Sequence, residues 1–577
     1  MNILAMGITP WGDRDHLALY NSRCGHEVRL LGIEADADYH FAAAETAAEA
    51  IERVARDWPP DVLFCGCPEL YPPPRQLEAC PILTVAMVSD WNLYQPQLEH
   101  NLARFDLVLT DRLGTERLQL EGAEPQYAGP LYSHRSLVHR NRLGKRDIDV
   151  LFLGNLNHAI HRERGKVLEQ AAALSDEYTV LIDGGYEPET YTALMNRARI
   201  VLNYSVRREM NLRTFETLAC GALLFTEDSN LEVGDWLSHG IEMVRYNAAN
   251  LESQLRHYLE HERERQRIAR AGAERARELA AEQRMDPLFN TLAKASRGPR
   301  PFPSFPEETR ELADVLLYAS SREPAQRALS HALVDAWCEK NPGLLSARLA
   351  AGCACIERCG RMEGAPRRAM LQAGLAHFGR ATELAPGEVV PWLNLAIVAR
   401  QAQAVPLERT CLEHALEAPS ATYGGLLLGH VHDPYYAGWR RALAEGRAEP
   451  AMLHAAAATR LAEAALHAGE PDAGLRTART AIRLKPDVAA PYRLAAIAES
   501  HAGNIEEAAR LLEQGLPYNA FDAAYRMDLA TALDGAGRTG EARQLAEISA
   551  RIFQACPKME EDAQRFRDWF ERKKAER

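Results

Sequence analysis

No run of 18 or more apolar residues occurs in the 577-residue chain, so a transmembrane helix is not expected. The first residues, MNILAMGITPWG, lack a basic leader and a cleavage site and are typical of a β-strand rather than a signal peptide. The formal net charge of −13 argues against general nucleic-acid binding. These absences predict a cytoplasmic protein that does not bind nucleic acid.

The eleven cysteines follow no disulfide-scaffold spacing, which predicts reduced thiols. The densest group comprises Cys353, Cys355 and Cys359, without a CxxC pair or a nearby histidine. A metal site is one interpretation of this group, and small apolar helix positions are the favoured one. Two histidine pairs stand at near-helical spacing: His134 with His139, and His158 with His161. Neither pair has an evident third ligand, so no metal is predicted.

Short runs rich in Val, Ile and Leu alternate with amphipathic stretches over residues 1 to about 290, as βα units of parallel sheets do. The first series of predicted strands is NILAMGIT, EVRLLGIE, DVLFCGC, ILTVAMV and LVLTD; the second is DVLFLGN, YTVLIDG, RIVLNYS, ALLFTED and IEMVRY. We therefore predict two Rossmann-like domains, residues 1–132 and 133–296, that face each other across a cleft. Residues 251–282 are expected to form one long outer helix.

The composition changes at residue 297. Residues 297–310 hold four prolines (Pro299, Pro301, Pro303 and Pro306), too many for a helix or a central strand, which predicts a stiff linker. Residues 311–577 are rich in Ala and Leu and are predicted to be helical to the end.

A repeat organises this helical tail. Gly469, Gly503 and Gly537 recur every 34 residues, an interval typical of tetratricopeptide repeats. The stretch YGGLLLGHVHDPYYAGWRRAL breaks the rhythm and is expected to be an insertion. The fold class predicted for the whole chain is α/β followed by all-α, with two Rossmann-like domains and a solenoid of tetratricopeptide-like repeats.

Polar residues crowd the point where the strand RIVLNYS leads through VRREMN into the helix LRTFETLAC. A helix N-terminus favours phosphate, and it lies at the strand edge where open α/β sheets bind ligands. Asn211 is expected to cap the helix, Arg213 to reach a phosphate oxygen, and Glu216 to accept the hydroxyls of a ribose. The neighbouring strand end and first helical turn complete the candidate set: Asn203, Tyr204 and Thr214.

The alternative for this stretch is a solvent-exposed loop with a surface ion pair between Glu209 and Arg207 or Arg208. Such pairs are common and contribute little to stability.

The segment MNLRTFETLACGALLFTE, followed by GIEMVRYNAANLESQLRHYLEHERERQRIARAG, resembles the C-terminal half of the CgeB-type (spore-maturation) glycosyltransferases. These are relatives of the group-1 glycosyltransferases with the two-Rossmann GT-B fold. DVLFLGNLNHAIHRERGKVLEQ is similar to that family's glycine loop and following basic helix. The resemblance spans residues 1–285 and is strongest over 149–275. It implies a nucleotide-sugar donor held mainly by the second domain, an acceptor on the first, and no metal.

By position, the resemblance assigns the ribose hydroxyls to Glu216 and places Arg213 and Asn211 near the diphosphate or the sugar. Glu209 stands where related retaining enzymes place the first Glu of a Glu-x7-Glu pair. Six residues, not seven, separate Glu209 from Glu216, so retaining and inverting stereochemistry both stay open.

The glycine loop supplies further candidates. Gly154 and Asn155 would let the backbone approach the donor, and Arg162 or Arg164 would neutralise phosphate. Without a metal, Arg213 and the helix N-terminus must stabilise most of the charge that develops on the leaving diphosphate. Arginine suits this task because its planar fork binds phosphate through two hydrogen bonds.

The first domain offers three candidates at its predicted strand ends. Gly7 would allow a sugar or phosphate to approach the backbone, although a tight turn explains it equally. Asp90 is the candidate base if the enzyme inverts, and the alternative is a helix N-cap formed by Ser89 or Asp90. Trp91 would stack on a sugar face or simply fill the core.

These features predict a metal-independent glycosyltransferase that moves a sugar to a protein hydroxyl, with catalytic candidates Asp90, Glu209 and Arg213. The repeats would hold the polypeptide acceptor or a partner, a design similar to that of O-GlcNAc transferases; flagellin or another bacterial surface protein is the client that this analogy suggests. The alternatives are a nucleotide-sugar epimerase on the same frame and a scaffold whose transferase half is inactive. The repeats could also mediate self-association into a homo-oligomer. No cofactor is expected beyond the nucleotide-sugar co-substrate, whose base (UDP, GDP or dTDP) stays open.

Overall fold

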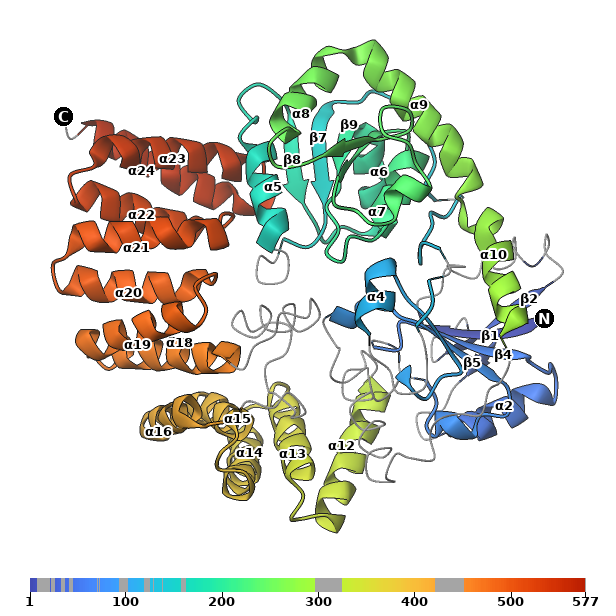
Figure 1. The fold of residues 1–577 in the computed structure, drawn as a ribbon, viewed down its shortest axis with the longest axis horizontal. Helices are drawn as coiled ribbons and strands as arrows, with labels where there is room; N and C mark the ends of the chain where they lie inside the picture. Colours follow the sequence, from blue (N-terminus) through green and yellow to red (C-terminus); the bar gives the residue numbers. More distant parts are fainter. Residues whose placement is uncertain are drawn as a thin grey trace.

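The computed structural model describes residues 1–7, 21, 26–32, 37–40, 45–69, 71, 73–92, 102–118, 125–127, 129–136, 138–156, 162–295, 324–420 and 451–575. Within them, two parallel β-sheets with packed helices are followed by a helical solenoid (Figure 1). The prediction of two α/β domains followed by an all-α region is therefore confirmed. No helix in these ranges is long and apolar enough to cross a membrane.

The first sheet has the order β3-β2-β1-β4-β5-β6, with all pairs parallel. Its strands are β1 (Asn2–Gly7), β2 (Glu27–Gly32), β3 (Tyr39–His40), β4 (Val62–Gly66), β5 (Leu83–Met87) and β6 (Leu107–Leu109). Its helical segments are α2 (Ala47–Ala55), η1 (Leu77–Ala79) and α4 (Arg112–Arg117). The order reverses between β1 and β4, and an open α/β sheet binds its ligand at the carboxyl ends of such a pair.

The second sheet has the order β11-β10-β9-β7-β8 and is also parallel. Its strands are β7 (Ile148–Leu153), β8 (Val180–Asp183), β9 (Ala198–Leu202), β10 (Leu223–Glu227) and β11 (Val244–Tyr246). The helical segments around it are α5 (Arg162–Ala172), α6 (Pro188–Arg197), α7 (Leu212–Ala219) and η2 (Val233–Asp235). Here the order reverses between β7 and β9, so their carboxyl ends form the second ligand edge.

The prediction of one continuous outer helix over residues 251–282 is wrong, because the helix breaks at His261. The structure has α8 (Leu251–Glu260), α9 (Glu262–Glu278) and α10 (Ala281–Lys294) instead. Helix α8 packs on α5, whereas α9 packs on α7 and β10, so the chain changes direction between them.

The last of these helices returns to the first domain. Leu292 of α10 is buried in the cluster that contains Ile3, Phe64 and Val85 of the first sheet. The segment predicted to end the second domain therefore contributes to the core of the first.

The solenoid comprises paired helices that stack in sequence (Figure 1). Its helices are α12 (Pro324–Lys340), α13 (Leu345–Cys359), α14 (Gly364–Leu384), α15 (Val389–Gln401), α16 (Val405–Glu417), α18 (Ala451–His467), α19 (Pro471–Leu484), α20 (Ala489–His501), α21 (Ile505–Gly515), α22 (Ala523–Gly535), α23 (Thr539–Gln554) and α24 (Glu560–Ala575), with short η4 (Leu516–Tyr518) and η5 (Pro557–Met559). Gly469, Gly503 and Gly537 each have φ between 76° and 81°, the left-handed turn that favours glycine. The predicted linker and insertion fall on residues 297–310 and 423–443, outside the described ranges.

The C-terminal end of the solenoid packs directly on the second α/β domain (Figure 1). One hydrophobic cluster joins Leu168 and Val180 of that domain to Phe521 and Phe553 of the repeats. The backbone N–H of Ile182, on the edge strand β8, donates to the carbonyl of Ala555 (2.8 Å). The solenoid thus covers a sheet edge that would otherwise present unpaired backbone groups.

Candidate active site

The N-terminus of α7 lies at the carboxyl ends of β7 and β9, as the sequence predicts. Asn211 is the N-cap residue, and its side chain accepts a hydrogen bond from the backbone N–H of Thr214 (3.3 Å). Its amide also donates to Oδ1 of the fully buried Asn203 (3.0 Å). The predicted capping role of Asn211 is confirmed, and the helix N-terminus opens on the ligand edge of the second sheet.

Arg213 lies in the first turn of α7 and points back over the end of β7. Its Nε donates to the carbonyl of Leu153 (2.8 Å), and its Nη1 donates to Oδ1 of Asn203 (2.9 Å). The guanidinium carbon lies 4.4 Å from the centroid of the Phe152 ring. A backbone carbonyl, an amide oxygen and an aromatic face thus hold this cation, and none of them is charged.

A second guanidinium, that of Arg164, lies beside the first. It is buried, donates to the carbonyls of Asn155 (3.0 Å) and Tyr204 (2.9 Å), and lies 5.5 Å from the Phe152 centroid. Burial, and then the charge of Arg213, lower the pKa of Arg164 to about 9. No ion pair with a carboxylate of the described ranges neutralises either arginine, so two like charges face one edge.

Glycine at position 154 is required by this arrangement. A Cβ on Gly154 would lie 2.3 Å from Nη2 of Arg213. The close approach that the sequence predicts at Gly154 is therefore made to the Arg213 side chain.

Glu216 is buried one turn beyond Arg213. Its Oε2 accepts a hydrogen bond from the hydroxyl of Tyr191 (2.7 Å), and its Oε1 lies 3.5 Å from Nε2 of His139. Burial raises the pKa of the Glu216 carboxyl, against the Tyr191 hydrogen bond and the charge of Arg213. A carboxylate accepts about four hydrogen bonds, so these two contacts leave capacity for the hydroxyls of a ribose.

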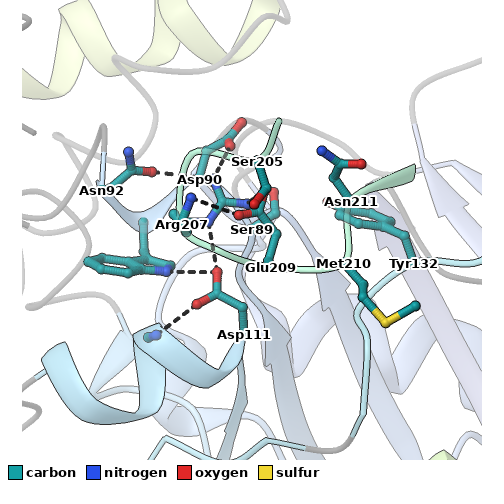
Figure 2. Close-up of polar contacts among 12 residues, drawn as sticks. Ser89, Asp90, Asn92, Asp111, Tyr132, Ser205, Arg207, Glu209, Met210 and Asn211 are labelled. Atoms are coloured by element: carbon teal, nitrogen blue, oxygen red, sulfur yellow. Dashed lines mark hydrogen bonds and ion pairs between the residues drawn. The ribbon is translucent and has the colours of Figure 1, made fainter. Parts of the chain in front are cut away.

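Arg207 connects the two α/β domains (Figure 2). From the loop before α7, its Nε donates to Oδ2 of Asp111 (2.7 Å) and its Nη1 to Oδ1 of Asp90 (3.0 Å), both in the first domain. Its Nη2 lies 3.5 Å from Oε1 of Glu209. With 8% of its side chain exposed, Arg207 holds three carboxylates of both domains around one charge.

This cluster corrects the alternative interpretation of the loop. The predicted pairing of Glu209 with Arg207 is present, but both residues are buried rather than on the surface. Arg208 instead adopts a left-handed conformation and donates to the carbonyl of Ser229 (3.0 Å).

A second connection between the domains is made by Glu232. Its carboxylate accepts from the backbone N–H of Arg112 in the first domain (2.9 Å) and from that of Met210 in the second (2.8 Å). The Arg112 guanidinium also pairs with Asp235. The ligand edge of the first domain is therefore held against the α7 loop.

Asp90 lies at the carboxyl end of β5, where 40% of its side chain is exposed. Beneath it, Oε1 of Glu69 accepts from the backbone N–H groups of Ser89 (3.0 Å) and Asp90 (2.9 Å). Oε2 of Glu69 is buried without a hydrogen-bond partner in the described part of the chain. Burial, and then the charge of Asp90, raise the pKa of Glu69 to about 7.

Two acceptor-side candidates are placed differently from expectation. Trp91 is fully buried, and its indole N–H donates to Asp111 (3.0 Å); no face is open to a sugar, so the stacking role is wrong and the core alternative holds. Gly7 has φ 73°, and a Cβ there would lie 2.1 Å from the carbonyl oxygen of Gly66. The close approach at Gly7 is thus to the neighbouring strand, which supports the tight-turn alternative.

Several candidates receive no structural test. The side chain of Arg162 and the pair His158 and His161 lie outside the described ranges. Within those ranges, no group of three His, Cys, Asp or Glu side chains is arranged to hold a metal ion. Cys355 and Cys359 are buried on α13, as small apolar helix positions would be.

Sequence reasoning missed four groups at the site: Asp111, Glu69, His139 and Tyr191. Asp111 follows β6 as Asp90 follows β5, so the strand-end signal that found Asp90 also applies to it. Glu69 lies three residues beyond the glycine that ends β4, in a segment without a helical pattern. Tyr191 and His139 approach Glu216 from α6 and from the segment before β7. No local motif marks Tyr191, and the spacing of His139 from His134 indicates a metal ligand rather than a partner of Glu216.

Comparison with known proteins identifies the second α/β domain by class. Residues 151–290 match the family model described as Glycosyl transferase-like, so this region is a glycosyltransferase-like domain. No curated protein matches the chain.

Several solved structures are similar to a share of this chain. A sucrose-phosphate synthase from Thermosynechococcus elongatus is 10% identical, covering 51% of this chain and 100% of that chain with a TM-score of 0.36. YrrB, described as a TPR protein with an unusual peptide-binding site, is 10% identical, covering 41% and 97% with a TM-score of 0.29. MamA is 12% identical, covering 33% and 87% with a TM-score of 0.24.

Proposed function

We propose that this chain is a glycosyltransferase that transfers a sugar from a nucleoside-diphosphate sugar to a hydroxyl of a polypeptide acceptor. The observation that carries the proposal is the pair Arg164 and Arg213, which both lie over the Phe152 ring at the N-terminus of α7. Arg164 is buried and Arg213 is partly buried, and neither forms an ion pair with a carboxylate of the described ranges. Their like charges repel each other, and an anion bound there relieves that repulsion. A diphosphate has the charge and the oxygens that this edge requires.

Two glutamates near the same edge are proposed to make the remaining contacts with the donor. Glu216, held by Tyr191 and His139, is proposed to accept ribose hydroxyls. Glu209, fixed by Arg207, lies where the loop passes between the domains and is proposed to face the transferred sugar.

The proposed reaction breaks the bond between the anomeric carbon and the diphosphate oxygen. The electron pair of that bond goes to the diphosphate, whose new charge Arg164, Arg213 and the α7 N-terminus stabilise. The acceptor oxygen forms the new bond to the anomeric carbon. In the inverting case the hydroxyl proton goes to Asp90, whose carboxylate Arg207 holds at the domain interface.

The proposed acceptor is a polypeptide because the chain carries a repeat solenoid fixed to the transferase half. Solenoids of this kind present extended concave surfaces for chain segments. The buried contacts at its C-terminal end give that surface a constant position relative to the donor edge. A flagellin-like client remains a proposal by analogy.

The test is an assay of nucleoside diphosphate release by the full chain, supplied with UDP-, GDP- and dTDP-sugars. We expect one donor class to be turned over, and the Glu216→Gln variant to raise its KM by about tenfold because one charged acceptor is lost. The matched control is Glu242→Gln, which changes a Glu of the same domain that accepts from the Ser238 N–H (2.7 Å).

The outcomes distinguish the alternatives. Donor consumed to a sugar isomer without diphosphate release would indicate an epimerase. Absence of binding to all three nucleoside diphosphates would indicate a scaffold and would contradict the proposed function. Equal losses in the Glu216 and Glu242 variants would remove the assigned ribose role.

A further inference from the structure

The last repeat of the solenoid contacts the loop that follows β8. The ammonium group of Lys558, in η5, forms an ion pair with Oδ1 of Asp183 (3.1 Å) and donates to the carbonyl of Gly184. Asp183 ends β8 and is 2% exposed, whereas 59% of the Lys558 side chain is exposed. The solenoid therefore places a cation on a buried carboxylate at the carboxyl edge of the second sheet.

The loop that follows β8 contacts Gly154, which lies beside Arg213. The backbone N–H of Gly154 donates to the carbonyl of Asp183 (2.8 Å), and a Cβ on Gly184 would lie 2.2 Å from the carbonyl oxygen of Gly154. Gly154 in turn packs against the guanidinium of Arg213. A continuous series of contacts thus runs from Lys558 through two glycine backbones to Arg213.

Other ion pairs of this interface lie away from the ligand edge. Arg551 pairs with Asp176 (2.9 Å), which precedes β8 and so lies at the amino end of that strand. The buried Arg526 pairs with Glu169 in the body of α5. Among the described residues, the interface therefore holds one ion pair at the ligand edge, Lys558 with Asp183, and a comparable pair, Arg551 with Asp176, at the opposite edge.

We infer that Lys558 is a donor-positioning residue that the repeat solenoid contributes to the transferase site. A carboxylate at Asp183 lies on the edge where the proposed diphosphate binds, and its charge would oppose that ligand. Lys558 neutralises this charge and holds the Asp183–Gly184 backbone against Gly154. The donor site is thus complete only when the last repeat is docked. This inference rests on the proposed function.

The test compares Lys558→Met with Arg551→Met in the full chain by calorimetric titration with UDP, GDP and dTDP. Both variants remove one ion pair between the solenoid and the α/β domain, and Met keeps an unbranched apolar side chain. We expect Lys558→Met to raise the Kd of the nucleotide that the wild type binds by about fivefold. Arg551→Met should leave that Kd within about twofold, and Lys558→Arg should retain most of the affinity.

Steady-state kinetics adds a measurement that a merely structural role would not reproduce. In Lys558→Met we expect KM for the nucleotide-sugar to rise while kcat at saturating donor stays within about twofold, because the step at the anomeric carbon does not involve Lys558. If Lys558→Met fails to fold, Lys558→Gln removes the charge while keeping a donor for the Gly184 carbonyl, and the same titration applies.

Three results would overturn the inference. Unchanged affinity in Lys558→Met, with normal binding by the wild type, removes the positioning role and leaves the proposed function intact. Equal losses in Lys558→Met and Arg551→Met show a general effect of docking. Absence of nucleotide binding by the wild type contradicts the proposed function and this inference together.

Discussion

The two α/β domains place different charged side chains at their ligand edges. At the carboxyl edge of the second sheet lie Arg164 and Arg213, which donate hydrogen bonds to backbone carbonyls and to the side-chain oxygen of Asn203. At the carboxyl edge of the first sheet lie three acidic side chains, which follow β4, β5 and β6 in turn: Glu69, Asp90 and Asp111. A cationic edge suits a leaving diphosphate, and an anionic edge suits a hydroxyl that must lose its proton. Under the proposed function, two domains of one Rossmann-like frame serve the two halves of the transfer reaction, and they differ in the charged side chains at their strand ends.

The largest expected effect is on the cationic edge. Arg213→Met keeps the apolar contact with Phe152 but removes the charge, so we expect the Kd for the bound nucleoside diphosphate to rise by about 100-fold. Calorimetric titration measures this change.

A matched control lies at the other edge of the same sheet. Arg146 donates to the carbonyls of Ala198 (2.6 Å) and Cys220 (2.8 Å), so it resembles Arg213 in its partners but precedes β7. Arg146→Met should lower the melting temperature without changing the affinity. An equal loss of affinity in both variants would show that any partly buried arginine next to the sheet matters, and the assignment of the diphosphate to Arg164 and Arg213 would fail.

The next effect concerns the anionic edge. Asp90→Asn keeps an oxygen for Arg207 but cannot take a proton, so we expect kcat for transfer to fall by about 100-fold while donor affinity stays unchanged. The control is Asp106→Asn, because Asp106 accepts from the Thr84 N–H (2.8 Å) at the amino edge of the same sheet. Full transfer activity in Asp90→Asn would exclude Asp90 as the base.

The last prediction concerns a change of stability with pH. Burial raises the pKa of Glu69 from the ordinary value of 4.5 to about 7. Between these values the unfolded chain has lost the proton that the folded protein keeps, so the contribution of Glu69 to stability falls as pH rises through this window. The loss is complete above pH 7 and amounts to at most about 3 kcal/mol.

The Glu69→Gln variant isolates this contribution because glutamine does not ionise. We expect the melting temperature of the variant minus that of the wild type to increase as the pH rises from 5 to 7.5. The same difference in melting temperature at pH 5 and pH 7.5 would show that Glu69 does not change its ionisation in this range, and it would contradict the raised pKa of Glu69.

Much of this architecture is readable from local sequence patterns. All ten predicted strands are present, since runs of Val, Ile and Leu bounded by polar residues mark buried parallel strands. The strand β3 has two residues and shows no pattern of its own. The N-cap at Asn211 and the glycine turns at Gly469, Gly503 and Gly537 were predictable because each has a local physical cause.

The contacts between distant segments were not readable in this way. Arg207 lies 96 residues from Asp111 and 117 from Asp90, so nothing in its own loop distinguishes a bridge between domains from a surface pair. The docking of the last repeat on the second α/β domain could not be predicted either, because an Ala- and Leu-rich helix face fits a neighbouring repeat or an α/β domain equally well. The burial of Trp91 likewise follows from its contact with Asp111, not from its position after β5.

The central claim is that an anionic leaving group binds where β7 and β9 diverge. It is tested most directly by a structure of the full chain with the nucleoside diphosphate that it binds. The account predicts phosphate oxygens about 3 Å from the guanidinium groups of Arg164 and Arg213, beside Gly154. A nucleotide seated on the solenoid or on the far side of the sheet, with both arginines still bound to their carbonyls, would contradict it.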